Sequence, residues 1–363
     1  MVLLSVTVYP LAATFETDNN MLELLAQSIV AVGAAVSRLT YRFFGAPSFM
    51  AQLNLDAIGF ANMFIFNGWW VWRNLRYRIA APPCGKATWI EYSGAPIATG
   101  EVIVWLPGGG FLFHDSWEVS IARALLPRLA SEHGRAPPLL VFHYTLPSKL
   151  ESAPLEVDKV LRWLREECGI ERIVLAGDSA GGFLVINHLL SACRSSSVCR
   201  IDAGIALYPV LDLSFSGDSY TTNAHLDGLH MRFLNSAVRS FAGERSEKEL
   251  RKASPAFAAR QVLTKAMGEG QPRVVIVSGE RDLLCSDVQL FCAAAKQAAR
   301  HSGILDWAHV DGGAFGVHCG ALLPAHIVGH SPSVIRAFDA CYLACKDVLQ
   351  PVAAPAKRRR FSR

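Results

Sequence analysis

One serine of the chain lies in a setting that suits a nucleophile. Residues 177–182 read Gly-Asp-Ser-Ala-Gly-Gly, after an apolar run at 173–176 and before a helical pattern at 180–193. A sharp strand-to-helix turn projects a serine hydroxyl at the helix N-terminus, where the helix dipole favours a developing anion. Small residues at positions 177 and 181 let the strand and the helix approach closely. We therefore predict that Ser179 is a nucleophile, and not a passive residue of a glycine-rich turn.

A serine nucleophile also needs hydrogen-bond donors for the oxyanion that its attack creates. Gly108, Gly109 and Gly110 follow an expected strand at 102–106 and expose backbone N–H groups without Cβ obstruction. We predict an oxyanion hole made of these glycines and Ala180, in which Gly108 shapes the turn. The alternative for the glycine run is a flexible turn.

The acid and the base of such a site follow the nucleophile along the chain. Asp282 comes just beyond an expected strand at 274–277, where the acid belongs, whereas Glu280 is a weaker candidate. Asp287 is expected to brace the same turn. His318 lies on a loop after the last expected strand and is the predicted base.

Other histidines fit the role of base less well. His309 would lie within the last strand, and His326 and His330 come later, towards the last helix. In the predicted mechanism His318 takes the proton of Ser179 during attack on an acyl carbon, and Asp282 orients the imidazole. An acyl-enzyme forms, and water releases it.

The elements around these residues alternate between short apolar runs and helical patterns from residue 85 onward. This alternation predicts an α/β fold with a mostly parallel sheet covered by helices on both faces. No apolar strand occurs between 212 and 260, so we expect an insertion that forms part of a cap. The expected strands are 88–92, 101–106, 139–144, 173–176, 205–208, 274–277 and 305–310, and the expected helices are 116–130, 154–167, 180–193, 288–299 and 334–348.

The composition excludes several classes of protein. With 51% hydrophobic and 18% charged residues in 363, the chain is not of the disordered type. Its formal net charge of +4 gives no overall field for nucleic acid, and much of the excess lies in a tail at 349–363 that we expect to be disordered. Nine scattered cysteines without a C-x-x-C pair favour free thiols in a reducing compartment. No metal or cofactor is predicted, because H-E-x-x-H, P-loop and dinucleotide-binding motifs are absent.

The first 84 residues form a separate apolar segment. A helical pattern at 22–36 is followed by an aromatic-rich stretch at 58–72 with arginines after it. This stretch is either a cap helix over a substrate pocket or an interfacial helix, which would give membrane-surface contact through residues 21–78. The localisation therefore stays open between a soluble intracellular and a membrane-associated protein.

These residues resemble the hormone-sensitive lipase family of α/β-hydrolases, which includes the arylacetamide deacetylase-like esterases. The matching motifs are Gly-Asp-Ser-Ala-Gly-Gly at 177–182, Gly-Gly-Gly-Phe at 108–111, His-Tyr-Thr-Leu-Pro at 143–147, Tyr-Pro at 208–209, Ser-Pro at 254–255 and G-x-x-D-x-L-x-x-D at 279–287. The resemblance covers about residues 85–348. It implies a carboxylic ester hydrolase with a helical cap, built from the N-terminal segment and the 212–260 insertion.

The chain departs from the family pattern at three places. Pro107 replaces the histidine before the glycines, His143 replaces an aspartate, and Cys319-Gly320 stands where Gly-Phe would follow the catalytic histidine. None of these changes removes the nucleophile, the acid or the base. The main hypothesis is an esterase or lipase that cleaves a small apolar ester. An amidase or formamidase with the same triad and a non-catalytic small-molecule receptor on the same fold are the alternatives, and the presence of His318 argues against the receptor.

Overall fold

The computed structural model describes residues 68–258, 272–298, 305–310, 316–322 and 331–349. The helical pattern at 22–36, most of the aromatic stretch and the basic tail at 349–363 lie outside the described residues, apart from residue 349. For these segments the predictions stay untested.

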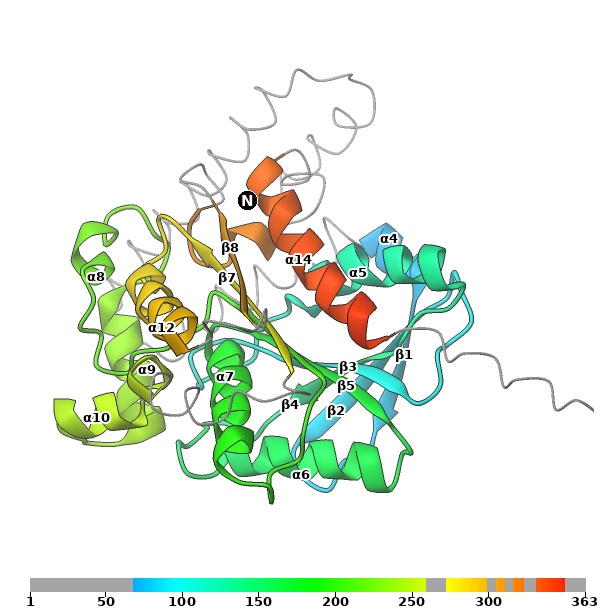
Figure 1. The fold of residues 1–363 in the computed structure, drawn as a ribbon, viewed down its shortest axis with the longest axis horizontal. Helices are drawn as coiled ribbons and strands as arrows, with labels where there is room; N and C mark the ends of the chain where they lie inside the picture. Colours follow the sequence, from blue (N-terminus) through cyan, green and yellow to red (C-terminus); the bar gives the residue numbers. More distant parts are fainter. Residues whose placement is uncertain (1–67, 259–271, 299–304, 311–315, 323–330, 350–363) are drawn as a thin grey trace, which may run out of the picture.

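A mixed sheet of eight strands forms the centre of the molecule (Figure 1). Its strand order is β1-β2-β4-β3-β5-β6-β7-β8. The pairs β1–β2 and β2–β4 are antiparallel, and all other neighbours are parallel. The predicted α/β fold with a mostly parallel sheet is therefore confirmed.

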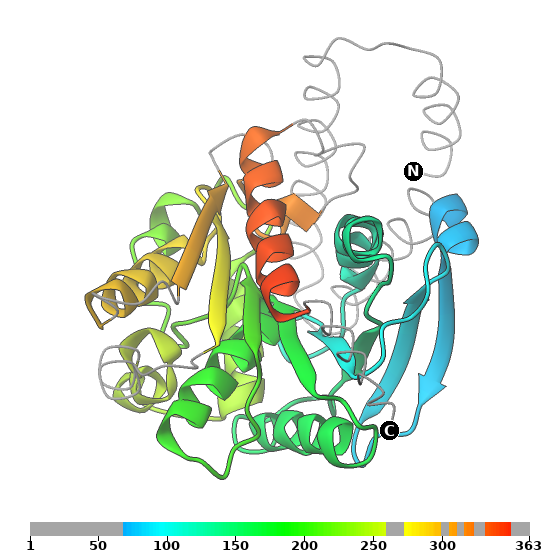
Figure 2. The ribbon, with the colours of Figure 1, turned by 45° about the vertical axis from the view of Figure 1, so that its right-hand side comes forward.

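Helices cover both faces of this sheet (Figures 1 and 2). On β3, Val102, Val104 and Leu106 join the core under α6, α7 and α12, whereas Ile103 and Trp105 join the core under α5 and α14. Because successive side chains of a strand point to opposite faces, a strand buried on both faces is apolar throughout. This explains why β3 appears in the sequence as a continuous apolar run.

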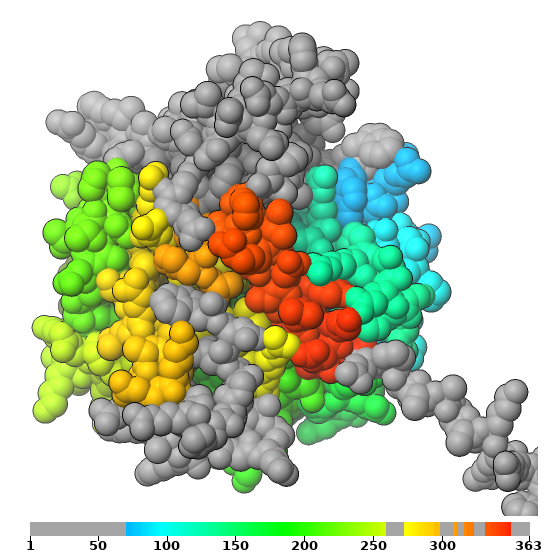
Figure 3. Space-filling view, turned by 45° about the horizontal axis from the view of Figure 1, so that its top comes forward, coloured from blue at the N-terminus to red at the C-terminus, as the bar shows by residue number. Residues whose placement is uncertain are grey.

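The two helices on the second face lie side by side, as the space-filling view shows (Figure 3). Ion pairs between Arg128 and Asp339 and between Glu132 and Lys346 join α5 to α14 across their exposed sides. These pairs are surface interactions, so the apolar contacts beneath them hold the layer together.

The observed elements agree with most of the expected ones to within a few residues. The strands are β1 Leu75–Ala80, β2 Lys86–Tyr92, β3 Glu101–Leu106, β4 Leu139–His143, β5 Arg172–Asp178, β6 Ala203–Leu207, β7 Arg273–Gly279 and β8 Leu305–Val310. The helices are α4 Gly68–Asn74, α5 Glu118–His133, α6 Ala153–Glu166, α7 Ser179–Arg194, α8 Ser219–Thr222, α9 Met231–Ala242, α10 Glu247–Ala253, α12 Cys285–Ala298, α14 Pro332–Val348 and the short 3₁₀ helix η2 Gly320–Leu322.

Strand β1 was not predicted. The aromatic stretch ends in the short helix α4. Arg76 and Arg78, which follow this helix, lie in an edge strand, and Arg76 stands opposite Glu91 of β2 in the antiparallel register. Only the first and last residues of β1 are buried, so the strand carries no alternating apolar signal. Its basic residues had instead suggested the polar flank of a helix.

The segment between β6 and β7 leaves the sheet, as expected for an insertion. Its described part, residues 208–258 and 272, contains α8, α9 and α10, which Figure 1 shows grouped at one side near α12. Phe241 of α9 stacks on Phe111 with ring centroids 3.6 Å apart. The insertion therefore packs directly against the glycine loop after β3.

Candidate active site

Ser179 occupies the turn between β5 and α7. Its φ of 50° lies in the left-handed region, which is costly for a residue with a side chain and is typical of functional turns. A Cβ added to Gly177 would lie 2.7 Å from the carbonyl oxygen of Leu106, and one added to Gly181 would overlap that same oxygen. A Cβ on Gly177 would also meet the Gly181 backbone at 2.8 Å, which fits the predicted close approach of strand and helix, and the contact with β3 is an additional requirement that the sequence did not predict.

The glycine loop after β3 is anchored by its first residue. The Gly108 N–H donates to Asp178 Oδ1 at 3.0 Å and to Asp115 Oδ1 at 3.2 Å. The carbonyl of Pro107 accepts a hydrogen bond from the Tyr144 hydroxyl at 2.8 Å. These bonds tie the loop to the serine turn and to the end of β4 without the histidine that the family pattern has at position 107.

The next two glycines adopt backbone conformations that favour glycine, with φ of 101° at Gly109 and 63° at Gly110. Ala180 lies in the first turn of α7, whose N–H groups have no acceptor within the helix. Asp178 precedes this helix but makes no side-chain cap, because its carboxylate binds Gly108 instead. The loop and the helix N-terminus thus meet at the serine turn.

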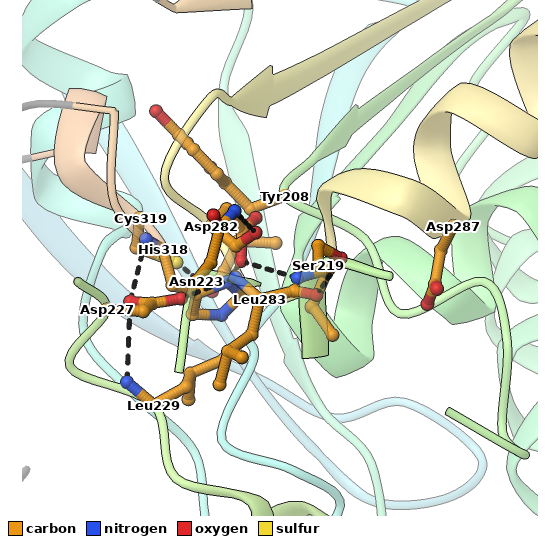
Figure 4. Close-up of polar contacts among 12 residues, drawn as sticks. Tyr208, Ser219, Asn223, Asp227, Leu229, Asp282, Leu283, Asp287, His318 and Cys319 are labelled. Atoms are coloured by element: carbon orange, nitrogen blue, oxygen red, sulfur yellow. Dashed lines mark hydrogen bonds and ion pairs between the residues drawn. The ribbon is translucent and has the colours of Figure 1, made fainter. Parts of the chain in front are cut away.

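Asp282 and His318 form a direct pair beyond the ends of β7 and β8. His318 Nδ1 lies 3.1 Å from Asp282 Oδ1, and the Asp282 carboxylate is fully buried (Figure 4). The same oxygen accepts from the Leu284 N–H at 2.9 Å, while Asp282 Oδ2 has no hydrogen-bond partner among the described residues. The pairing leaves Nε2 of His318 as the nitrogen directed away from the acid, which is the arrangement a general base needs.

One contact joins the loop of His318 to the serine turn, and Tyr208 packs against the same loop. The Cys319 thiol contacts Asp178 Oδ2 at 3.7 Å, so the residue after the base touches the residue before the nucleophile. The Tyr208 ring lies edge-on to the His318 ring at 5.9 Å, and its hydroxyl accepts from the Ala321 N–H at 3.0 Å. Since β5, β6, β7 and β8 are parallel, all three predicted catalytic residues lie at one edge of the sheet.

Asp287 was expected to brace the acid's turn, but its carboxylate binds the insertion instead. Its Oδ2 accepts from the Asp212 N–H at 3.0 Å and from the Tyr220 hydroxyl at 2.6 Å. Among the described residues its carboxylate makes no hydrogen bond to the Asp282–His318 pair, so it connects α12 to the insertion.

A family model described as alpha/beta hydrolase fold matches residues 103–312, which is more than half of the chain. The chain belongs to this family. This match confirms the predicted resemblance, and a solved esterase of the bacterial hormone-sensitive lipase family shares the fold.

One curated protein and several solved structures are similar to this α/β-hydrolase. An acetyl-hydrolase of Streptomyces hygroscopicus is 29% identical over 215 residues, which are 57% of this chain and 66% of that protein. The solved esterase of the bacterial hormone-sensitive lipase family has a TM-score of 0.59 at 23% identity and covers 75% of this chain and 85% of its own. A carboxyl esterase of the fungus Tuber melanosporum has a TM-score of 0.59 at 19% identity, with 76% and 88% covered. At these identities the solved structures show the fold alone.

Two carboxyls, those of the buried Asp178 and the half-buried Asp115, lie together beside Gly108 in this α/β-hydrolase. Burial raises the pKa of Asp115 well above its usual range, and the charge of Asp178 and a hydrogen bond to it add to the shift. Burial also raises the pKa of Asp178 to about 6, although the bond from Asp115 opposes the shift. The hydrogen bond between the two carboxyls therefore favours the proton on Asp115, while Asp178 accepts the Gly108 N–H.

The environment of His318 favours its charged form. Burial lowers the pKa of His318, but the charge and hydrogen bond of Asp282, with the charges of Asp227 and Asp115, raise it more, so the net pKa lies above its usual value of 6.5. No group of His, Cys, Asp and Glu within the described ranges could hold a metal ion.

The raised pKa of His318 predicts the acidic limb of the pH profile. A general base must be neutral to accept a proton, so kcat/KM for ester hydrolysis is expected to rise with pH through a value above 6.5. The measurement is kcat/KM from pH 5 to 9 at constant ionic strength. A limb centred below pH 6.5 would contradict the role of Asp282 and its neighbours in holding the proton on His318.

Sequence reasoning missed three polar residues of this site. Asp115 bonds the glycine loop, Asn223 Nδ2 donates to the carbonyls of Glu280 and Asp282, and Asp227 binds both loops that carry the acid and the base. Asp115 stands close to the Gly-Gly-Gly-Phe motif, which was a signal for it. Asn223 and Asp227 lie in a polar stretch of the insertion with no local motif to mark them.

Proposed function

We propose that this α/β-hydrolase is a serine carboxylesterase of the esterase and lipase type, which cleaves small apolar acyl esters. The observation that carries the proposal is the strained Ser179 at the same sheet edge as the bonded pair of Asp282 and His318. The names of the similar proteins, an acetyl-hydrolase and several esterases, support an ester as the substrate.

In the proposed mechanism Ser179 attacks the acyl carbon while His318 accepts its proton. Asp282 keeps the imidazole in the tautomer with Nδ1 protonated and stabilises its positive charge. The N–H groups of Gly109, Gly110 and Ala180 stabilise the oxyanion. His318 then donates the proton to the leaving alcohol, an acyl-enzyme remains on Ser179, and water releases the acid by the reverse sequence.

Gly108 has a different role in this scheme. Its N–H already donates to Asp178 and Asp115, so it holds the loop in place and leaves the donation to the next two glycines. The backbones of Gly109 and Gly110 fit this division, because both residues have a positive φ, which favours glycine, whereas Gly108 does not.

The proposal is tested by hydrolysis of 4-nitrophenyl acyl esters from acetate to palmitate, with 4-nitroacetanilide as the amide. Turnover of the esters far above the anilide, with a fluorophosphonate probe attached to Ser179 by peptide mass analysis, is the expected result. Preference for the anilide would favour the amidase alternative. Folded protein that is inert to esters, anilide and probe would overturn the proposal of an enzyme and favour the receptor alternative.

We further propose that the segment ending in β1 contacts a membrane surface. Trp72 is 82% exposed and Ile79 is 87% exposed, and Arg73, Arg76 and Arg78 between them are also exposed. Exposed apolar and basic side chains together are typical of interfacial binding to anionic lipid. No helix in the described part of the chain is long and apolar enough to cross a membrane.

Binding to vesicles of phosphatidylcholine and phosphatidylserine tests this contact. Replacing both Trp72 and Ile79 by Ser is expected to lower the partition coefficient about tenfold, because two exposed apolar side chains no longer bury in the interface. Leu155→Ser is the control, since Leu155 is also exposed, at 62%, but lies on α6. Equal sedimentation of all three proteins would overturn the contact.

A further inference from the structure

Asp227 is a buried carboxylate that no part of the proposed mechanism uses. It lies in the insertion between α8 and α9, and only 1% of it is exposed. Its Oδ2 accepts from the Leu283 N–H at 2.7 Å, and its Oδ1 accepts from the His318 N–H at 3.1 Å and from the Leu229 N–H at 3.4 Å. Figure 4 shows the carboxylate between the loop of the acid and the loop of the base.

Two of these bonds go to backbone N–H groups in the loops that carry the acid and the base. Leu283 directly follows Asp282, and the other N–H belongs to His318 itself. A carboxylate that binds both backbones therefore fixes the distance between the two loops, and with it the 3.1 Å contact between His318 Nδ1 and Asp282 Oδ1.

Neighbouring residues of the insertion hold only the acid's loop. Asn223 Nδ2 donates to the Glu280 and Asp282 carbonyls at 3.0 and 2.9 Å, and the Ser219 hydroxyl donates to the Leu283 carbonyl at 2.6 Å. Among the hydrogen bonds of these three residues of the insertion, only those of Asp227 reach the base's loop as well.

The charges around Asp227 make it an electrostatic neighbour of the base. The charge of Asp227 raises the pKa of His318, and burial followed by the charge of Asp282 raises the pKa of Asp227 to about 6. The titratable groups facing this pair come from four loops: Asp282 after β7, Cys319 after β8, Tyr208 after β6 and Asp115 after β3.

We propose that Asp227 is a positioning residue of the triad, which clamps the backbones of Leu283 and His318 together and places a buried carboxylate beside the base. The inference rests on the proposed esterase function. It assigns to the insertion a part in the rate of the reaction, in addition to any part in substrate selection.

Two variants separate the geometry of the clamp from its charge. In Asp227→Asn the amide nitrogen faces either the Leu283 N–H or the N–H groups of His318 and Leu229, and the charge is lost. We expect kcat to fall about 10- to 100-fold with KM within about twofold, and the acidic limb of kcat/KM to move to lower pH. In Asp227→Glu the charge stays but the carboxylate moves by one methylene, so kcat falls while the limb keeps its position.

Asp212→Asn is the matched control. Asp212 is also buried and lies in the same insertion, but its carboxylate bonds only Ser214 and Ser216 of its own turn. The control is expected to lose some thermal stability and to keep the wild-type acidic limb. Amide hydrogen exchange adds a readout that needs no activity: protection of Leu283 and His318 should fall together in Asp227→Asn, with no such change in the control.

The outcomes are distinct. Folded Asp227→Asn with kcat within twofold of wild type and an unchanged limb would overturn the proposal, as would a lower melting temperature with no shift of the limb. If Asp227→Asn does not fold, an Asp227→Glu protein with wild-type kcat and wild-type amide protection overturns it. Wild-type protein that hydrolyses no ester and does not react with the fluorophosphonate would instead refute the esterase function, and the exchange measurement would still decide whether the clamp exists.

Discussion

The Ser179→Ala variant is expected to hydrolyse 4-nitrophenyl esters with kcat lowered about 10⁴- to 10⁶-fold. Removing the hydroxyl removes the nucleophile, so the acyl-enzyme cannot form. The remaining rate would come from direct attack of water on the bound ester, which the oxyanion donors still stabilise. KM should change little, because the alanine leaves the backbone of the turn and the substrate contacts in place.

The experiment measures 4-nitrophenolate release by purified variants whose fold is checked by circular dichroism. Ser191→Ala is the control, since Ser191 lies on the same helix α7 and its hydroxyl only donates to Asn187. Its kcat should stay within about twofold of wild type. A Ser179→Ala protein with more than a hundredth of the wild-type kcat would mean that another residue attacks the ester.

The Gly181→Ala variant is expected to lose both stability and activity. The added Cβ would overlap the Leu106 carbonyl oxygen and lie 2.6 Å from its carbon and 2.9 Å from the Pro107 oxygen. These atoms belong to the backbone of β3 and the glycine loop, so relief requires α7 to move away from the sheet. Because overpacking of this kind costs about 3 kcal/mol or more, we expect the melting temperature to fall by roughly 6–12 °C.

The displacement would also separate the Ser179 turn from the glycine loop, so any folded fraction should hydrolyse esters slowly. Gly228→Ala is the control for stability, because a Cβ there meets no atom within 4 Å. Thermal unfolding followed by circular dichroism makes the comparison. If Gly181→Ala melts like wild type, α7 and β3 do not pack as closely as the structure shows.

The sequence predicted the fold for a physical reason. Strands such as β3 and β5 are buried on both faces, so they read as unbroken apolar runs next to their glycine motifs. The pairing of Asp282 with His318 follows from chain order and from the parallel ends of β7 and β8. That Ser179 reacts with this pair remains a prediction.

What the sequence missed depends on contacts between distant parts of the chain. Asp227 binds Leu283 and His318, which lie 56 and 91 residues further along. Asp115 meets Asp178 only because the glycine loop folds onto the serine turn. Strand β1 was missed because its central residues, among them Arg76 and Arg78, are exposed and show no apolar alternation. The strand is held by its backbone pairing with β2. Only Asp115 lies close to a motif that could mark it; Asp227 and β1 leave no local period or motif.

The insertion's contacts bear on how new specificities can arise in this scaffold. Phe241 packs on the loop of the oxyanion donors, while Asn223 and Asp227 bind the loops of the acid and the base. A chimaera that receives the insertion of a relative would therefore exchange the contacts that support the predicted triad together with the helices α8, α9 and α10. Transplants that keep residues 219–229 and replace only the following helices should retain turnover more often than exchanges of the whole segment.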